Sequence, residues 1–415
     1  AAIPGLARKL PHYGKYSYLG FQGEAPDNVA KGRWPTTGSP LSVLVGQDAG
    51  PVTPAKLPAR KPLARLAPVF DEARLMSHVT WLADPAREGR GAGTKGLDDA
   101  ADYIAVAFEK AGLKPAGDDG SFFQQFEAEN GPEGKTVALR NVVGVIPGTN
   151  PKLAPQSVVL GAHYDHLGRG WPDARAGTQG EIYNGADDNA SGVAVLLELA
   201  ELLGKTHKPS RTLVFVAFTG EEWGLKGSQH YVNTMKTWPA NRALAMVNMD
   251  TVGRLGTGKI QVLGSGTATE WRHIAMGVGF TTGVESECIS DDPGGSDQQS
   301  FVKVGVPGVQ IFTGAHEDYH RPSDDVEKID AAGLVKVATF VRESIVYLCE
   351  RPEPLTSTLK AGGNAQPTPR RGEGRRVSFG TMPDFAFRGP GVKVASVIEN
   401  SPAAKAGIEK GDILL

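Results

Sequence analysis

Four short apolar runs, each ended by a polar cluster, are the feature that most constrains the fold of this chain. They cover residues 157–162, 212–218, 243–249 and 306–312 and are rich in strand-forming valine, isoleucine and phenylalanine. Near-continuous apolar strands that alternate with helical stretches indicate a largely parallel sheet with both faces covered. We therefore predict an α/β fold with a mostly parallel, twisted central sheet and helices on both faces.

The polar residues that follow these runs lie where such a sheet binds its ligands. In open α/β sheets, ligands bind outside the carboxyl ends of the strands. Polar clusters on one edge of the sheet are expected to converge there. The candidates, in the order of the runs that they follow, are His163 and Asp165, Glu221 and Glu222, Asp250, and Tyr319 and His320.

A pair of adjacent acids, Asp187 and Asp188, lies in a turn of small residues just ahead of an apolar helical stretch, residues 193–203. Two neighbouring carboxylates repel each other unless a cation or a proton relieves the repulsion. An acidic turn on its own is usually a solvated helix start. Together with the acids and histidines at the strand ends, this turn indicates a metal site.

The residues of this edge supply two imidazoles and three carboxylates, which is a ligand set for two metals. The predicted ligands are His163, Asp187, Glu222, Asp250 and His320. Mixed nitrogen and oxygen ligands suit zinc, and the ligand types leave manganese or cobalt open. Two metals about 3.5–4 Å apart share a bridging carboxylate, and we predict Asp187 as the bridge and two zinc ions per chain. Glu221 is then free to act as general base on a metal-held water.

Four other polar residues near the motifs are more typical of loop or exposed positions than of ligands. They are His166, Glu181, His316 and Glu317.

These motifs resemble those of the dinuclear-zinc aminopeptidases of the M28 peptidase family, in the family's order and over about half of the chain. The matching stretches are His163-x-Asp165, residues 184–192, residues 221–228, Asn248-x-Asp250 and Tyr319-His320-x-Pro322-x-Asp324. The resemblance implies that His163 and Asp250 bind one metal, that Glu222 and His320 bind the other, and that Asp187 bridges them. It also implies a cis peptide between Asp187 and the acid that follows it.

The resemblance gives further residues their roles. Glu221 would be the catalytic base, and Tyr319 would hydrogen-bond the oxyanion. Asp165 would orient His163, and Asp324 would orient His320, as outer ligand partners commonly do. Asp297 would be a second outer acceptor, although the histidine that commonly follows it in the family is a glutamine here.

The implied function is hydrolysis of the N-terminal peptide bond of peptides, by a water that bridges the metals and is activated by Glu221. Two alternatives share the scaffold. Glutaminyl cyclases are acyltransferases with a single zinc, and they usually lack the Asp-Asp-Asn-x-Ser-Gly run, so Asp188 and Asn189 favour the hydrolase. A carboxypeptidase of the same fold is the other alternative.

Beyond the catalytic segment, composition indicates further parts. We predict an N-terminal extension or the end of a preceding domain over residues 1–66, the catalytic domain over 67–350 and a linker over 351–376. Residues 377–415 resemble the first half of a PDZ domain of the bacterial protease-associated type, with a strand at 391–397 and a helix at 401–408. Helices are also expected at 70–82, 96–111 and 332–348, and an antiparallel pair at 122–127 and 136–146.

The net charge of −2 gives no reason to expect nucleic-acid partners. No apolar run approaches the roughly 20 residues that span a bilayer. The chain begins at Ala1 without methionine, so we expect a processed, secreted or periplasmic protein that is part of a longer precursor with further domains. Whether Cys288 and Cys349 pair is left open.

Overall fold

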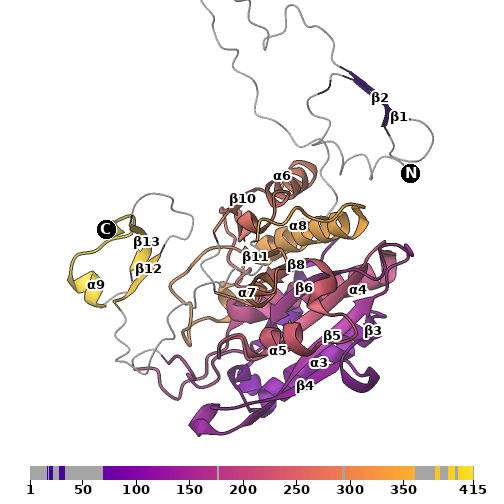
Figure 1. The fold of residues 1–415 in the computed structure, drawn as a ribbon. Helices are drawn as coiled ribbons and strands as arrows, with labels where there is room; N and C mark the ends of the chain where they lie inside the picture. Colours follow the sequence, from indigo (N-terminus) through magenta and orange to yellow (C-terminus); the bar gives the residue numbers. More distant parts are fainter. Residues whose placement is uncertain are drawn as a thin grey trace, which may run out of the picture. The chain divides into compact units, whose positions relative to one another are not determined.

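The computed structural model describes residues 16, 18–21, 28–32, 69–174, 177–291, 295–359, 379–383, 391–397 and 401–414. Its main feature within these residues is a nine-stranded sheet in the order β10-β9-β11-β8-β6-β7-β5-β3, with β4 paired to β5 (Figure 1). The strands are β3 (Lys114–Pro115), β4 (Phe123–Ala128), β5 (Val137–Ile146), β6 (Ser157–His163), β7 (Thr212–Phe218), β8 (Ala243–Met249), β9 (Ile260–Leu263), β10 (Ser286–Ile289) and β11 (Gly308–Phe312).

The centre of the sheet is parallel and its flanks are mixed. Strand β6 runs parallel to both β7 and β8, and β8 runs parallel to β11. These four strands are the four apolar runs of the sequence, and all but one of their residues are buried. The β4–β5 hairpin joins β7 antiparallel, and β9 joins β11 antiparallel. The predicted α/β class is confirmed, with antiparallel strands added outside the parallel centre.

Helices cover both faces of the sheet, as one strand demonstrates. Phe215 and Phe218 are three residues apart in β7, so their side chains point to opposite faces. The ring of Phe215 lies 6.0 Å from that of Phe108, whereas the ring of Phe218 lies 6.0 Å from Tyr231 and 6.2 Å from Phe301. The α-helices between residues 69 and 359 are α2 (Glu72–Leu82), α3 (Lys95–Lys110), α4 (Gly192–Thr206), α5 (Lys226–Thr234), α6 (Trp271–Thr282), α7 (Gln298–Lys303) and α8 (Ala331–Glu350).

Side-chain caps fix where three of these helices begin. Asp71 accepts from the backbone N–H of Arg74 at the start of α2, Thr94 caps α3, and Asp330 accepts from Gly333 at the start of α8. Such caps satisfy amide groups that have no partner within the helix. The three predicted helices and the predicted antiparallel pair are confirmed to within two residues at each end.

Two smaller sheets lie outside the nine-stranded sheet in sequence, one near each end of the chain. Strands β1 (Tyr18–Phe21) and β2 (Asn28–Gly32) form an antiparallel pair. Near the C-terminus, β12 (Thr381–Pro383), β13 (Val392–Val397) and β14 (Ile413–Leu414) form a three-stranded sheet with the short helix α9 (Pro402–Lys405). The predicted strand and helix of this segment are present, and its likeness to a PDZ domain stays a prediction, as do the domain boundaries. The predicted linker lies outside the described residues from 360 onward.

Within the part of the chain that the structure describes, no helix is long and apolar enough to cross a membrane.

The apolar helix α4 carries one buried acid, which joins it to α2. Glu198 is 3% exposed. Both of its oxygens accept hydrogen bonds from Arg74 at 2.7–3.1 Å, and His78 lies 3.4 Å away. Burial alone would raise the pKa of Glu198, but the contacts with His78 and Arg74 outweigh it and lower the pKa below its ordinary value.

Glu198→Gln is expected to lower the free energy of unfolding at pH 7 by about 1–2 kcal/mol, because it removes a charge-assisted pair whose arginine is partly solvated. Since the folded pKa is lowered, this stability is present above the ordinary glutamate pKa of 4.5 and is lost as the pH falls below it. Urea unfolding at pH 7 and near pH 4 measures both effects. Glu201→Gln, one turn later on the same helix, is the control, because Glu201 is partly exposed and pairs with Lys205 on the helix surface. Equal losses for the two variants would contradict this assignment.

Candidate metal centre

Elements far apart in the sequence bring the candidate residues to the carboxyl edge of the parallel strands. His163 is the last residue of β6, and Asp250 directly follows β8. Glu221 and Glu222 follow the end of β7. The turn Ala186–Ser191 precedes α4 and enters the same place.

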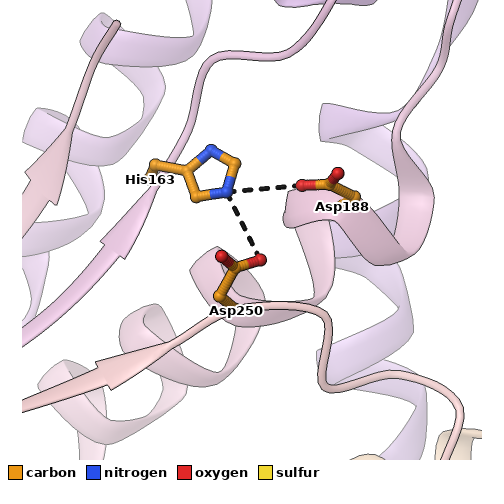
Figure 2. A group of neighbouring side chains, drawn as sticks. All are labelled: His163, Asp188 and Asp250. Atoms are coloured by element: carbon orange, nitrogen blue, oxygen red, sulfur yellow. Dashed lines mark ion pairs between the residues drawn. The ribbon is translucent and has the colours of Figure 1, made fainter. Parts of the chain in front are cut away.

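A first cluster consists of His163, Asp188 and Asp250 (Figure 2). Nε2 of His163 lies 3.3 Å from Oδ1 of Asp188 and 3.4 Å from Oδ1 of Asp250. All three side chains are buried, with residue exposures of 1–7%. Buried carboxylates need a compensating positive charge, so this cluster is a candidate site for a cation.

The hydrogen bonding of His163 indicates what that charge is. Its Nδ1 lies 3.1 Å from the backbone oxygen of Asp165, and because a carbonyl only accepts, this nitrogen carries a proton. Nε2 of a neutral ring therefore directs a lone pair at two carboxylates. Burial lowers the pKa of His163, but the carboxylates of Glu221 and Asp250 outweigh it and raise the pKa well above its ordinary value. Either a proton or a metal must occupy this position, and the imidazole and carboxylate donors fit zinc.

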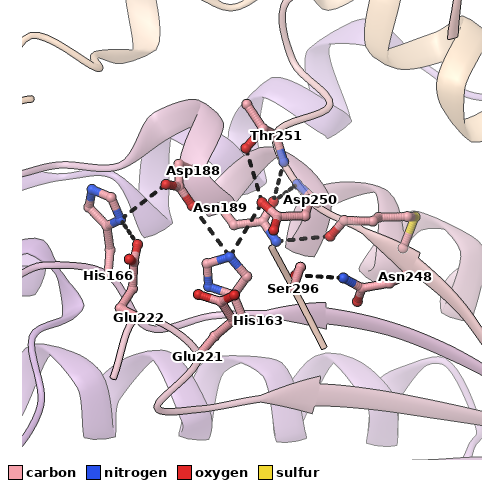
Figure 3. A network of polar contacts seen from close by, with 12 residues as sticks. His163, His166, Asp188, Asn189, Glu221, Glu222, Asn248, Asp250, Thr251 and Ser296 are labelled. Atoms are coloured by element: carbon pink, nitrogen blue, oxygen red, sulfur yellow. Dashed lines mark hydrogen bonds and ion pairs between the residues drawn. The ribbon is translucent and has the colours of Figure 1, made fainter. Parts of the chain in front are cut away.

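A second cluster adjoins the first through the other oxygen of Asp188. Oδ2 of Asp188 lies 3.2 Å from Nε2 of His320, which in turn lies 3.1 Å from Oε2 of Glu222. The other oxygen of Glu222 lies 2.7 Å from Nδ1 of His166 (Figure 3). Burial would raise the pKa of Glu222, but His320 and other neighbours lower it to about 2. Each oxygen of Asp188 thus faces a different imidazole.

The predicted bridge, Asp187, does not enter either cluster, and the structure corrects this prediction by one residue. Oδ1 of Asp187 accepts from the Ser191 hydroxyl at 2.9 Å and from the backbone N–H of Gly253, and Oδ2 lies 3.0 Å from Nε2 of His316. The turn departs from helical geometry at Asp188 (φ −107°, ψ 92°). The two neighbouring acids therefore point in different directions. The cis peptide is displaced in the same way, since it follows Asp188 and not Asp187.

Asp165 supports the site by a different contact from the one predicted. Its carboxylate accepts from the backbone N–H groups of Glu221 and Glu222 at 3.2 and 3.4 Å. It lies 3.8 Å from Nδ1 of His163, which bonds instead to the Asp165 carbonyl. The carboxylate thus fixes the segment that carries the two glutamates, while the backbone orients His163.

Asp324 likewise holds the backbone and not His320. One of its oxygens accepts from the N–H groups of Asp187 and Asp188 at 2.9 and 3.0 Å, and the other pairs with Arg254 at 3.0 Å. This arrangement fixes the turn that presents Asp188. The acid that contacts Nδ1 of His320 is Asp173, at 3.1 Å.

The predicted catalytic residues lie beside the clusters. Figure 3 shows the carboxylate of Glu221 next to the His163 ring. Burial raises the pKa of Glu221 well above its ordinary value; His163 opposes this shift, and Glu222 and Asp250 reinforce it. The ring of Tyr319 stacks on that of His320, with centroids 3.9 Å apart. Burial raises the pKa of Tyr319, so its hydroxyl keeps its proton.

Asp297 is fully buried directly before α7. Burial raises its pKa to about 7, and the nearby charge of His163 opposes the shift. Beside it, the Ser296 hydroxyl accepts a hydrogen bond from Asn248 at 2.8 Å (Figure 3). The side chain of Gln298 accepts another from Asn248 at 3.1 Å. Gln298, the residue at the position of the family's histidine, therefore belongs to a buried network of amide side chains with Asn248.

Sequence reasoning missed two contributors to the second cluster. His166 was predicted to be a loop residue, yet it is 2% exposed and bonds Glu222. The available signal was its sequence position: His166 is three residues after His163, which ends a buried strand. Asp173 lies in an irregular segment, where no periodicity indicates which way a side chain points.

Comparisons with known proteins agree with this geometry. Residues 141–345 match the sequence model of Peptidase family M28. The chain is 28% identical over 235 residues to Aminopeptidase YwaD of Bacillus subtilis, a match that covers 53% of this chain and 47% of that protein. The chain thus spans about half the length of this curated relative.

Two solved structures share the fold. BSAP, a zinc aminopeptidase from Bacillus subtilis, superposes with a TM-score of 0.56 at 17% identity, over 71% of this chain and all of that one. Glutaminyl cyclase from Porphyromonas gingivalis superposes with a TM-score of 0.55 at 21% identity, over 67% of this chain and 99% of that one. The segment 141–345, which contains both clusters, therefore matches peptidase family M28, and the chain shares its fold with solved zinc exopeptidases.

Proposed function

We propose that this chain is an aminopeptidase that holds two zinc ions and removes the N-terminal residue of peptides. The observation that carries the proposal is the position of Asp188, whose two oxygens lie 3.3 and 3.2 Å from the imidazoles of His163 and His320. A carboxylate placed in this way suits a bridge between two metals. His163 and Asp250 would complete one site, and Glu222 and His320 the other.

Zinc, when bound here, would lower the pKa of a water molecule to about 7. Glu221 would take a proton from the attacking water and return it to the departing amine. Burial raises the pKa of Glu221, which is the direction that suits a carboxylate that both accepts and returns a proton. The protonated hydroxyl of Tyr319 would donate a hydrogen bond to the carbonyl oxygen as it becomes negative.

The preference for substrates with a free N-terminus would come from the carboxylates at the carboxyl edge of the parallel strands. Asp250, a member of the first cluster, and Glu221, next to it, are buried acids that would attract a substrate ammonium group. The relatives support this choice of substrate end, because both YwaD and BSAP are named as aminopeptidases.

A glutaminyl cyclase function is the second candidate, supported by the fold shared with the Porphyromonas gingivalis enzyme. Such an enzyme would need one zinc. A second cluster that shares Asp188 with the first favours the hydrolase. Zinc content, measured together with release of nitroaniline from leucyl-, lysyl- and glutamyl-p-nitroanilide before and after chelation, separates the two. Two zinc ions and chelator-sensitive release support the aminopeptidase, whereas one zinc and cyclisation of an N-terminal glutamine peptide support the cyclase.

Glu221→Gln is expected to bind zinc normally and to lose about 10²–10⁴-fold in kcat, because it removes the proton acceptor and leaves the metal ligands in place. Nitroanilide turnover and zinc content measured on the same sample test this. Glu317→Gln, an exposed acid in the segment before His320, is the matched control. Turnover near that of the unmodified chain would remove Glu221 from the role of base.

Asp188→Asn is expected to weaken both zinc sites, whereas Asp187→Asn should retain two zinc ions. The first change removes the negative charge shared by the clusters, and the second leaves an oxygen that still accepts from Ser191 and Gly253. Zinc per chain after dialysis against a weak chelator distinguishes them. The opposite ranking would restore Asp187 as the bridge.

A further inference from the structure

The segment 166–174, here called the β6 loop, supplies contacts to the second cluster that no ligand pattern predicts. His166 at its start bonds Glu222 at 2.7 Å, and Asp173 near its end bonds His320 at 3.1 Å. Between them, the ring of Trp171 lies 5.0 Å from that of Trp223, which directly follows Glu222. The β6 loop therefore contacts Glu222 and His320, the two predicted ligands that belong to the second cluster alone.

The contact of Asp173 decides which nitrogen of His320 is available to a metal. An ionised carboxylate only accepts hydrogen bonds, so Nδ1 of His320 carries the proton. Nε2 then presents its lone pair towards Asp188 and Glu222, at 3.2 and 3.1 Å. The backbone of His320 is in the left-handed region (φ 54°), a conformation that is strained for a non-glycine residue and persists only where its surroundings hold it. Asp173 is one of the groups that hold the ring in place.

The β6 loop is itself anchored to the core. Arg90 is fully buried and donates to the carbonyl of Tyr164 at 2.7 Å, before the loop, and to those of Asn184 and Gly185 at 2.8 and 2.9 Å, after it. The backbone N–H of His166 donates to the carbonyl of Arg90 at 3.2 Å. One buried guanidinium thus holds the chain just before the β6 loop and again at Asn184 and Gly185, further along the sequence.

The first cluster depends on a different kind of support. Nδ1 of His163 bonds to a backbone carbonyl, that of Asp165, at the end of a central strand. No side-chain substitution in the β6 loop removes that contact. The two histidines are therefore oriented by different groups: His163 by a backbone carbonyl at the end of a strand, and His320 by a side chain of the β6 loop.

We propose that Asp173 is a positioning residue for the second zinc: it holds Nε2 of His320 towards Asp188 and Glu222, so that the β6 loop sets the affinity of this site alone. The inference rests on the two-zinc function proposed above. Outer partners of metal-bound histidines commonly contribute 10–100-fold to metal affinity. Loss of Asp173 should therefore weaken zinc binding at the site of Glu222 and His320 and leave zinc binding at the site of His163 and Asp250 unchanged.

The test compares Asp173→Leu, which removes the acceptor at nearly constant size, with Asp173→Asn, which keeps an acceptor oxygen for Nδ1 of His320. Glu181→Gln, an exposed acid after the loop, controls for the lost charge. Zinc is titrated out of the full chain with a chelator of known affinity, and the spectrum of the cobalt-substituted protein is recorded in parallel. Asp173→Leu should release one zinc 10–100-fold more readily than the unmodified chain and keep the other unchanged. Asp173→Asn should be within a few-fold of the unmodified chain, and the cobalt spectrum of Asp173→Leu should change at one site only.

The outcomes that contradict the proposal are distinct from those that contradict the function. Two zinc ions in the unmodified chain, with Asp173→Leu retaining both or weakening both equally, would overturn the positioning role and leave the two-zinc aminopeptidase intact. A single zinc in the unmodified chain would overturn the two-zinc function itself, and this inference with it.

Discussion

The carboxylate of Asp188 is the group on which the rest of this site depends. Its two oxygens face His163 on one side and His320 on the other, at nearly equal distances. Burial would raise its pKa, but the surrounding imidazoles of His166, His163 and His320 lower the pKa well below its ordinary value. Asp188 therefore stays ionised in a buried position, and every other cluster residue is arranged around that negative charge.

A buried cluster of this kind is costly, because removing each ion from water costs several kcal/mol. The fold offsets part of this cost with backbone amides and two arginines. The carboxylate of Asp324 accepts two N–H groups of the turn and pairs with Arg254, and that of Asp165 accepts the N–H groups of the two glutamates. Arg90 ties together the chain on both sides of the β6 loop, although its burial lowers its own pKa to about 10. Two divalent cations would offset the remaining negative charge.

Much of the architecture could be predicted from the sequence, because burial of a parallel sheet leaves a strong pattern. The apolar runs became β6, β7, β8 and β11, and residues at their carboxyl ends, such as His163 and Asp250, meet at one edge. Position along a regular strand determines where its last side chain lies. The pairing of Glu222 with His320 was implied by the family resemblance, and the two side chains lie 3.1 Å apart.

The irregular segments could not be predicted in the same way. Asp187 and Asp188 are chemically equivalent neighbours, and only the non-helical backbone of their turn decides that the second one faces the clusters. His166 and Asp173 lie in a segment without periodicity, so their partners Glu222 and His320 depend on the folded path of the chain. Asp165 and Asp324 were predicted to orient His163 and His320, but their carboxylates bond backbone N–H groups, which carry no sequence signal.

Diffraction at the zinc absorption edge from crystals grown with zinc shows how many metals this site binds and where they lie. The expected result is two anomalous peaks about 3.5–4 Å apart, one beside His163 and Asp250, the other beside Glu222 and His320, with Asp188 between them. A single peak, or two peaks bridged by Asp187, would contradict it.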